Sequence, residues 1–152
     1  MNADQIAALE AVAGRTLSGA EKATLAPLVQ IRNDVAIAAL LSAGRTKHGP
    51  TQIGEGTVVA ILGDPRGGMF LDAVVELGAQ DRTVHWGMAP VRRGALDLSI
   101  PAARASLAAL KDKLDDYAAD VDKLLACGVV PDPIHFNTVS DALNKAEGRM
   151  TL

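Results

Sequence analysis

The chain has 152 residues, carries a net charge of −3, and is 49% hydrophobic but only 3% aromatic. This length supports one domain with a hydrophobic core and is short for two. Because Ala, Leu, Val and Ile carry the apolar volume, the composition favours a helical fold over a β-sandwich. The slight negative charge, without a dense run of Lys and Arg, argues against nucleic-acid binding.

The single cysteine, Cys127, excludes an intramolecular disulfide, and its apolar neighbours predict a buried thiol. The first residues lack the basic segment of a signal peptide, and no apolar run approaches the roughly 20 residues that cross a bilayer. We therefore expect a soluble protein that has no membrane partner.

Three helices are predicted in the first third of the chain. The first spans residues 2–13 and opens on an Asn-x-x-Gln capping box, and the second spans 20–28 after an S-x-x-E box that begins at Ser18. The third spans 35–43 and follows Asn33, which is a suitable N-cap. In each segment the apolar residues recur as they do on one face of a helix.

The stretch VVAILGDPRGGMF, residues 58–70, has three interpretations. A phosphate-binding loop is disfavoured, because Asp64 would repel phosphate, the next residue is a proline without an N–H group, and no Lys precedes a Ser or Thr. We favour an elbow between two helices, the first over 58–62, with Gly67 and Gly68 admitting the close approach of another helix. A strand followed by a tight turn stays open as the alternative.

The middle of the chain gives mixed signals. Residues 46–56 are rich in Gly and Pro and predict a loop. Residues 69–79 have helical periodicity, whereas residues 80–93 fit a helix only loosely because Gly87 and Pro90 interrupt them.

The longest signal is an apolar stripe over residues 100–126, which predicts one helix of roughly 40 Å. A break near Asp115 and Asp116 stays open, because Asp is a good N-cap. The stripe can pack within the domain or against another subunit, and we favour internal packing. The acidic residues of this segment are expected on a solvated helix face: Asp115, Asp116, Asp120 and Asp122.

The chain closes with an extended linker over residues 129–134, a helix over 139–145 and a loose tail over 149–152. These elements together predict an all-α fold. We expect a single compact multi-helix domain over residues 1–152, with one long helix in its C-terminal half.

The sequence contains no motif that carries chemistry. The three histidines, His48, His85 and His135, lack the spacing of a metal site, and no nucleophile motif surrounds Cys127. We therefore expect a protein that is not an enzyme, binds no metal and needs no cofactor.

One short segment gathers residue types that bind other proteins. It contains His85, Trp86, Arg92 and Arg93, and Trp and Arg are enriched at the energetic centres of protein interfaces. These four residues form the candidate partner-binding site. The alternative, which we favour from the sequence alone, is that Trp86 anchors the core and the two arginines keep the segment soluble.

Two parts of the chain resemble a group of small proteins encoded in tailed phages and prophages. The parts are RNDVAIAALLSAGRTK, residues 32–47, and VPDPI with VSDALNKAEG, residues 130–134 and 139–148. The segment LDL at 96–98 also fits the group. Such proteins typically lie among virion or tail genes, so the resemblance implies a structural or accessory virion role and a location in the host cytoplasm and then in the virion.

Our leading hypothesis is a non-enzymatic, minor tail or head–tail component of a phage. It would bind other phage structural proteins or further copies of itself. One alternative is a small phage protein that binds and inhibits a host or defence factor. A less favoured alternative is a ligand binder or enzyme that uses the loop at residues 46–56 and His85.

Overall fold

The computed structural model describes residues 1–149 and is mostly helical, as the composition predicts. The sequence predicts one domain, whereas the contacts divide the chain into two compact units. Unit 1 combines residues 1–46 with the described residues from 131 onward, and unit 2 is residues 47–130. Each unit has a hydrophobic core of its own. The tail expected over 149–152 lies outside the described residues except for its first residue.

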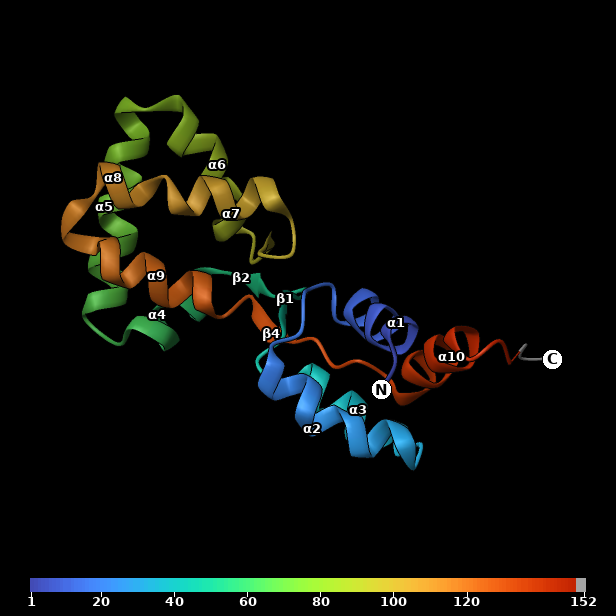
Figure 1. Ribbon diagram of the computed structural model, residues 1–152. Coiled ribbons are helices and arrows are strands. Elements are labelled where there is room, and N and C mark those ends of the chain that lie inside the picture. The colour runs from blue at the N-terminus through green and yellow to red at the C-terminus, as the bar shows by residue number, and fades with distance from the viewer. Residues whose placement is uncertain (150–152) are drawn as a thin grey trace. The chain divides into compact units, whose positions relative to one another are not determined.

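Unit 1 is built from helices at both ends of the chain. The first two helices open on the capping boxes predicted at Asn2 and Ser18, and Asn33 caps the third. Helix α10 packs against α1 and α3, which lie beside it in Figure 1. The four helices are α1 (Ala3–Ala13), α2 (Gly19–Gln30), α3 (Asp34–Ser42) and α10 (Phe136–Ala146).

The core of unit 1 needs both of its chain segments. Val139 and Leu143 of α10 are completely buried, and they join Leu9, Ile37 and Leu41 in one cluster. Burial of a Leu or Val side chain contributes about 1.5–3 kcal/mol. The α10 residues are therefore as important to this core as those of α1 and α3.

Unit 2 places helices around a two-stranded antiparallel sheet. In this sheet Gln52 pairs with Asp97 and Ile53 with Leu96. The loop expected over 46–56 therefore contains two strands, and β1 pairs with β4 of the expected linker. In chain order the elements from β1 onward are β1 (Thr46–His48), β2 (Gln52–Ile53), α4 (Glu55–Leu62), α5 (Arg66–Gln80), α6 (Arg82–Arg92), β3 (Leu96–Asp97), α7 (Pro101–Ala108), α8 (Leu110–Lys113), α9 (Ala118–Ala126) and β4 (Val129–Pro131).

The stretch at residues 58–70 is the elbow between α4 and α5, so the predicted elbow is confirmed and the strand alternative is wrong. The pattern also predicts Asp64 as the N-cap of the second helix, but Pro65 holds that position and α5 begins at Arg66. Helix α4 ends before Gly63, which has a φ of 81°. A Cβ atom on Gly67 would lie 2.6 Å from the Cα of Val59, whereas Gly68 has open space around it. Only Gly67 is needed for the close approach of the two helices.

The apolar stripe over residues 100–126 does not form one helix. Leu114 has φ −130° and ψ 70°, and a turn of 3₁₀-helix at Asp115–Tyr117 follows it. This is the break left open near Asp115. The chain reverses there, so that α9 packs on α7 and α8 and the two halves of the stripe enter the same core. Internal packing of the stripe is thereby confirmed.

The sequence predicts that Gly87 and Pro90 interrupt this segment, but helix α6 runs without a break from Arg82 to Arg92 and includes both residues. Its buried residues are Val84, Met88 and Val91. Within residues 1–149, no helix combines the length and apolar character required to cross a lipid bilayer.

Candidate protein-binding site

The predicted partner-binding residues lie on the outer face of α6 and at its C-terminal end. Trp86 is 68% exposed, so the alternative that it anchors the core is wrong. The physical reason is helical geometry, because Val84, Met88 and Val91 occupy the inner face. His85, Arg92 and Arg93 are also exposed.

Spacing along α6 adds a residue to this group. Arg82, His85, Trp86 and Arg93 follow intervals of three, four and seven residues, which place side chains on one face of a helix. The imidazole of His85 and the indole of Trp86 lie 4.8 Å apart at 90°. We call Arg82, His85, Trp86, Arg92 and Arg93 the α6 surface.

Side-chain contacts fix the start of α6. The carboxylate of Asp81 accepts the N–H groups of Thr83 and Val84 and forms a 2.6 Å ion pair with Lys113. These contacts, with Lys113 contributing most, lower the pKa of Asp81 below its usual value. The first turn of α6 is thus held to α5 and α8.

Two glycines bring α6 close to its neighbours. A Cβ atom on Gly78 of α5 would lie 3.3 Å from the Cα of His85. A Cβ atom on Gly87 would lie 3.3 Å from the Cβ of Ser106 in α7. The α6 surface is therefore presented by a helix that is packed closely on two sides.

Within residues 1–149, the arginines of the α6 surface have no carboxylate partners. Arg82, Arg92 and Arg93 form no ion pair with any residue in the range 1–149, and α6 itself contains no Asp or Glu. Arg104 of α7 likewise has no ion pair within residues 1–149, and its buried Nη1 atom has no hydrogen-bond partner there. The other arginines of this range are paired: Arg15, Arg32, Arg45, Arg66 and Arg149.

A small apolar cavity adjoins the α6 surface inside unit 2. Val58, Phe70, Met88 and Leu107 are among its walls, and its volume is about 40 Å³. A water molecule needs roughly 10–15 Å³ of such space, so the cavity has room for the end of an aliphatic side chain. The exposed residues in its lining are Glu55, Val75, His85 and Arg92.

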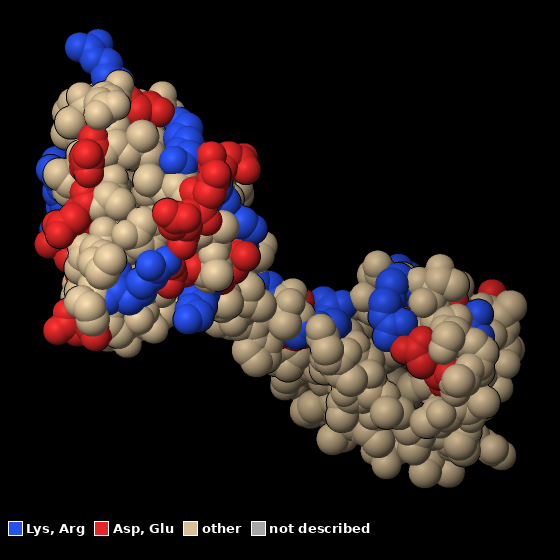
Figure 2. All heavy atoms as spheres, turned by 90° about the vertical axis from the view of Figure 1, so that its left-hand side faces the viewer, with Lys and Arg blue, Asp and Glu red and all other residues tan. Residues whose placement is uncertain are grey.

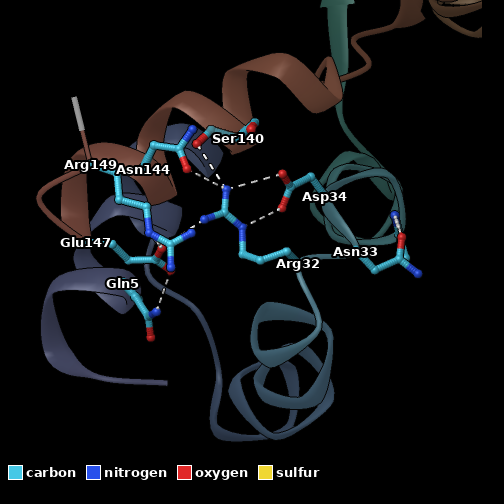
Figure 3. Close-up of polar contacts among 9 residues, drawn as sticks. Gln5, Arg32, Asn33, Asp34, Ser140, Asn144, Glu147 and Arg149 are labelled. Atoms are coloured by element: carbon cyan, nitrogen blue, oxygen red, sulfur yellow. Dashed lines mark hydrogen bonds and ion pairs between the residues drawn. The ribbon is translucent and has the colours of Figure 1, made fainter. Parts of the chain in front are cut away.

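A second polar cluster lies in unit 1 and surrounds Arg32 (Figure 3). The Arg32 guanidinium donates to Asp34 at 3.3 and 3.4 Å, to Glu147 at 2.9 Å, to Asn144 at 2.9 Å and to the carbonyl oxygen of Ser140 at 3.4 Å. Asp34 is the first residue of α3, whereas Ser140 and Asn144 belong to α10 and Glu147 follows it directly. The cluster therefore ties α10 to the start of α3.

This cluster joins two segments singled out in the sequence. Arg32 and Asp34 come from residues 32–47, and Asn144 and Glu147 come from residues 139–148. Arg45 likewise forms a 2.7 Å ion pair with Asp132 of the Pro-Asp-Pro linker. The quoted motif residues thus have folding roles in unit 1.

The sequence predicts that the acidic residues of α9 lie on a solvated helix face, and this prediction is wrong for Asp120. Asp120 is buried and forms a 2.7 Å ion pair with Arg66, whose guanidinium also lies 4.3 Å from the Tyr117 ring. Asp122 is exposed and pairs with Lys111 at 2.7 Å. On the side of unit 2 where α5 and α8 lie, Lys and Arg alternate with Asp and Glu (Figure 2). Asp120 was missed because its partner is far away in the sequence.

The remaining residues singled out in the sequence are dispersed. His48 lies on β1, whereas His135 caps α10 by accepting the N–H of Asn137. Cys127 is only half-buried, and its thiol donates to the carbonyl oxygen of Lys123 at 3.3 Å, so the predicted buried thiol is wrong. Among the described residues there is no group of His, Cys, Asp or Glu that could hold a metal ion.

Comparisons with known proteins give no relative: no family model, no curated protein and no solved structure matches the chain.

Only part of this candidate site is predictable from the sequence. Arg82 was overlooked, although its spacing from His85 and the absence of acidic residues in the segment were visible signals. Glu55 and Val75 carried no comparable signal, because the cavity that they line forms only when α4, α5 and α6 pack together.

Proposed function

We propose that this protein is a non-enzymatic protein-binding component and that it binds its partner through the α6 surface. The observation that carries the proposal is Trp86, which is 68% exposed on a closely packed helix beside unpaired arginines. Tryptophan and arginine dominate the binding energy of many protein interfaces. An indole that remains in water gains little for the fold and is available to a partner.

The resemblance to phage proteins supports a more specific role as a minor tail or head–tail component of a virion. It rests on residues 32–47, 130–134 and 139–148, which lie in or beside unit 1. The partner in this proposal is another phage structural protein or a second copy of the chain. The α6 surface belongs to unit 2, as does the LDL segment at 96–98, whereas unit 1 carries most of the longer motifs.

The test is incorporation into particles. Particles are purified from cells that produce the protein, and its copy number is measured with an antibody for the wild type and for Trp86→Ala. We expect the wild type to be incorporated and Trp86→Ala to be reduced about tenfold, which corresponds to about 1.4 kcal/mol of binding free energy.

Ile31→Ala is the matched control, because Ile31 is 70% exposed and lies in unit 1. Circular dichroism spectra verify that each variant is folded. Absence of the wild type from particles would contradict the virion role. Equal incorporation of Trp86→Ala and the wild type would contradict the site.

A further inference from the structure

We infer that the α6 surface and its cavity bind an acidic segment of the partner that carries an apolar side chain. The inference rests on the proposed function and adds the chemistry of the partner. In this arrangement the apolar side chain enters the cavity, and flanking carboxylates pair with the arginines of the α6 surface.

The first argument is charge. Arg82, Arg92 and Arg93 have no ion-pair partner among residues 1–149, and α6 itself has no acidic residue. The acidic residue in the cavity lining is Glu55 of α4, so the incoming carboxylates are assigned to the arginines of α6 and only the apolar side chain to the cavity. Arginine presents a planar fork that matches a carboxylate, and charge complementarity gives specificity and fast association.

The second argument is the position of the cavity. Arg92 and His85 line it together with the apolar residues Val74 and Met88, so one ligand can meet a cation and an apolar wall at the same place. Val75 is half-exposed at this position and adds apolar surface. A leucine, isoleucine or methionine end fits the available volume better than a ring.

The third argument is the extent of the positive charge, which separates an acidic peptide from a nucleic acid. Arg82 and Arg93 are roughly 16 Å apart along the helix axis. These arginines all lie on α6 or at its C-terminal end, and the exposed Glu55 of α4 lines the adjoining cavity. A short acidic segment matches a strip of this length, whereas a phosphate backbone carries its negative charge over a longer path.

The test uses the complete protein and four fluorescent probes in an anisotropy titration. The first is a capped peptide of about twelve residues with alternating pairs of Glu and Leu. The second has Lys in place of Glu, and the third has Ala in place of Leu. The fourth is a single-stranded oligothymidylate of about twenty nucleotides. We expect the first peptide to bind at least about tenfold more tightly than each of the others, and less tightly at high salt.

Variants of the protein locate the binding. Arg93→Glu and Val75→Glu are both expected to weaken the binding of the first peptide at least about tenfold. Lys145→Glu is the matched control for Arg93→Glu, because it makes the same change of net charge on an exposed residue of α10 in unit 1. It should leave the affinity within about twofold of the wild type.

The inference is overturned if the first peptide fails to bind at about 1 mM, if the Lys peptide or the oligothymidylate binds as tightly, or if Lys145→Glu weakens binding as much as Arg93→Glu. These failures are distinct from failure of the proposed function. If Trp86→Ala prevents incorporation into particles while the acidic peptide shows no preference, the site stands and only the partner chemistry is wrong.

Discussion

At the scale of single residues, Arg32 connects three segments of unit 1 through its side chain. It has a φ of 55°, which is rarely adopted by residues with a side chain, and its side chain is only 24% exposed. Its contacts to Asp34 and Glu147 hold this conformation and connect the start of α3 to α10.

We predict that Arg32→Ala lowers the free energy of unfolding by about 1–3 kcal/mol, because Asp34 loses its ion-pair partner and Glu147 keeps only Gln5 and the exposed Arg149 among residues 1–149. The measurement is urea denaturation followed by circular dichroism. Arg149→Ala is the matched control, since Arg149 also pairs with Glu147 but is 69% exposed. Its effect should be about 0.5 kcal/mol or less. Equal effects of the two changes would refute the special role of Arg32.

At the scale of elements, packing of α4 against α5 depends on one glycine of a pair. The missing side chain of Gly67 lets the helix backbones meet, whereas Gly68 faces open space. The two glycines are adjacent in the same helix turn, so their local helix propensities are similar. Comparing the stabilities of variants at the two positions therefore separates the effect of tertiary packing from the effect of helix propensity.

We predict that Gly67→Ala lowers the free energy of unfolding by about 1–3 kcal/mol, because its new methyl group would overlap the Val59 backbone. Gly68→Ala should have no such cost and should stabilise the protein by up to about 1 kcal/mol. Thermal or urea denaturation of both variants checks this. A Gly67→Ala protein as stable as Gly68→Ala would show that α4 and α5 do not meet closely.

At the scale of the whole molecule, the chain forms two compact units with separate cores. Unit 2 is one continuous segment, whereas unit 1 is assembled from the two ends of the chain. A continuous segment with its own core has what a domain needs to fold alone. A segment that lacks part of its core, such as residues 1–46, does not meet this requirement.

We predict that residues 47–130, produced alone, fold with a helical circular dichroism spectrum and a cooperative thermal transition. Residues 1–46 alone should be largely unfolded, because the buried Val139 and Leu143 of α10 are missing. Addition of a peptide covering residues 131–149 should restore helix to residues 1–46. A disordered 47–130 fragment would show that its core depends on the rest of the chain.

The sequence alone determined the features that depend on neighbouring residues. Capping boxes at Asn2 and Ser18, and the elbow after residue 62, are set by short-range hydrogen bonds and backbone preferences, and these were predicted correctly. The candidate partner-binding residues stand out by composition, because Trp and Arg are unusual enough in one segment to be noticed, and their role stays a prediction.

Only the tertiary structure decided the features that depend on distant partners. The break at Leu114 forms where the chain reverses so that both halves of one stripe enter the same core, and the Asp120–Arg66 pair joins residues far apart in the sequence. Division of one helical chain into two units, and the exposure of Trp86, have the same origin. Local signals state which faces are apolar, but the choice of which faces meet is made by the packing of the whole chain.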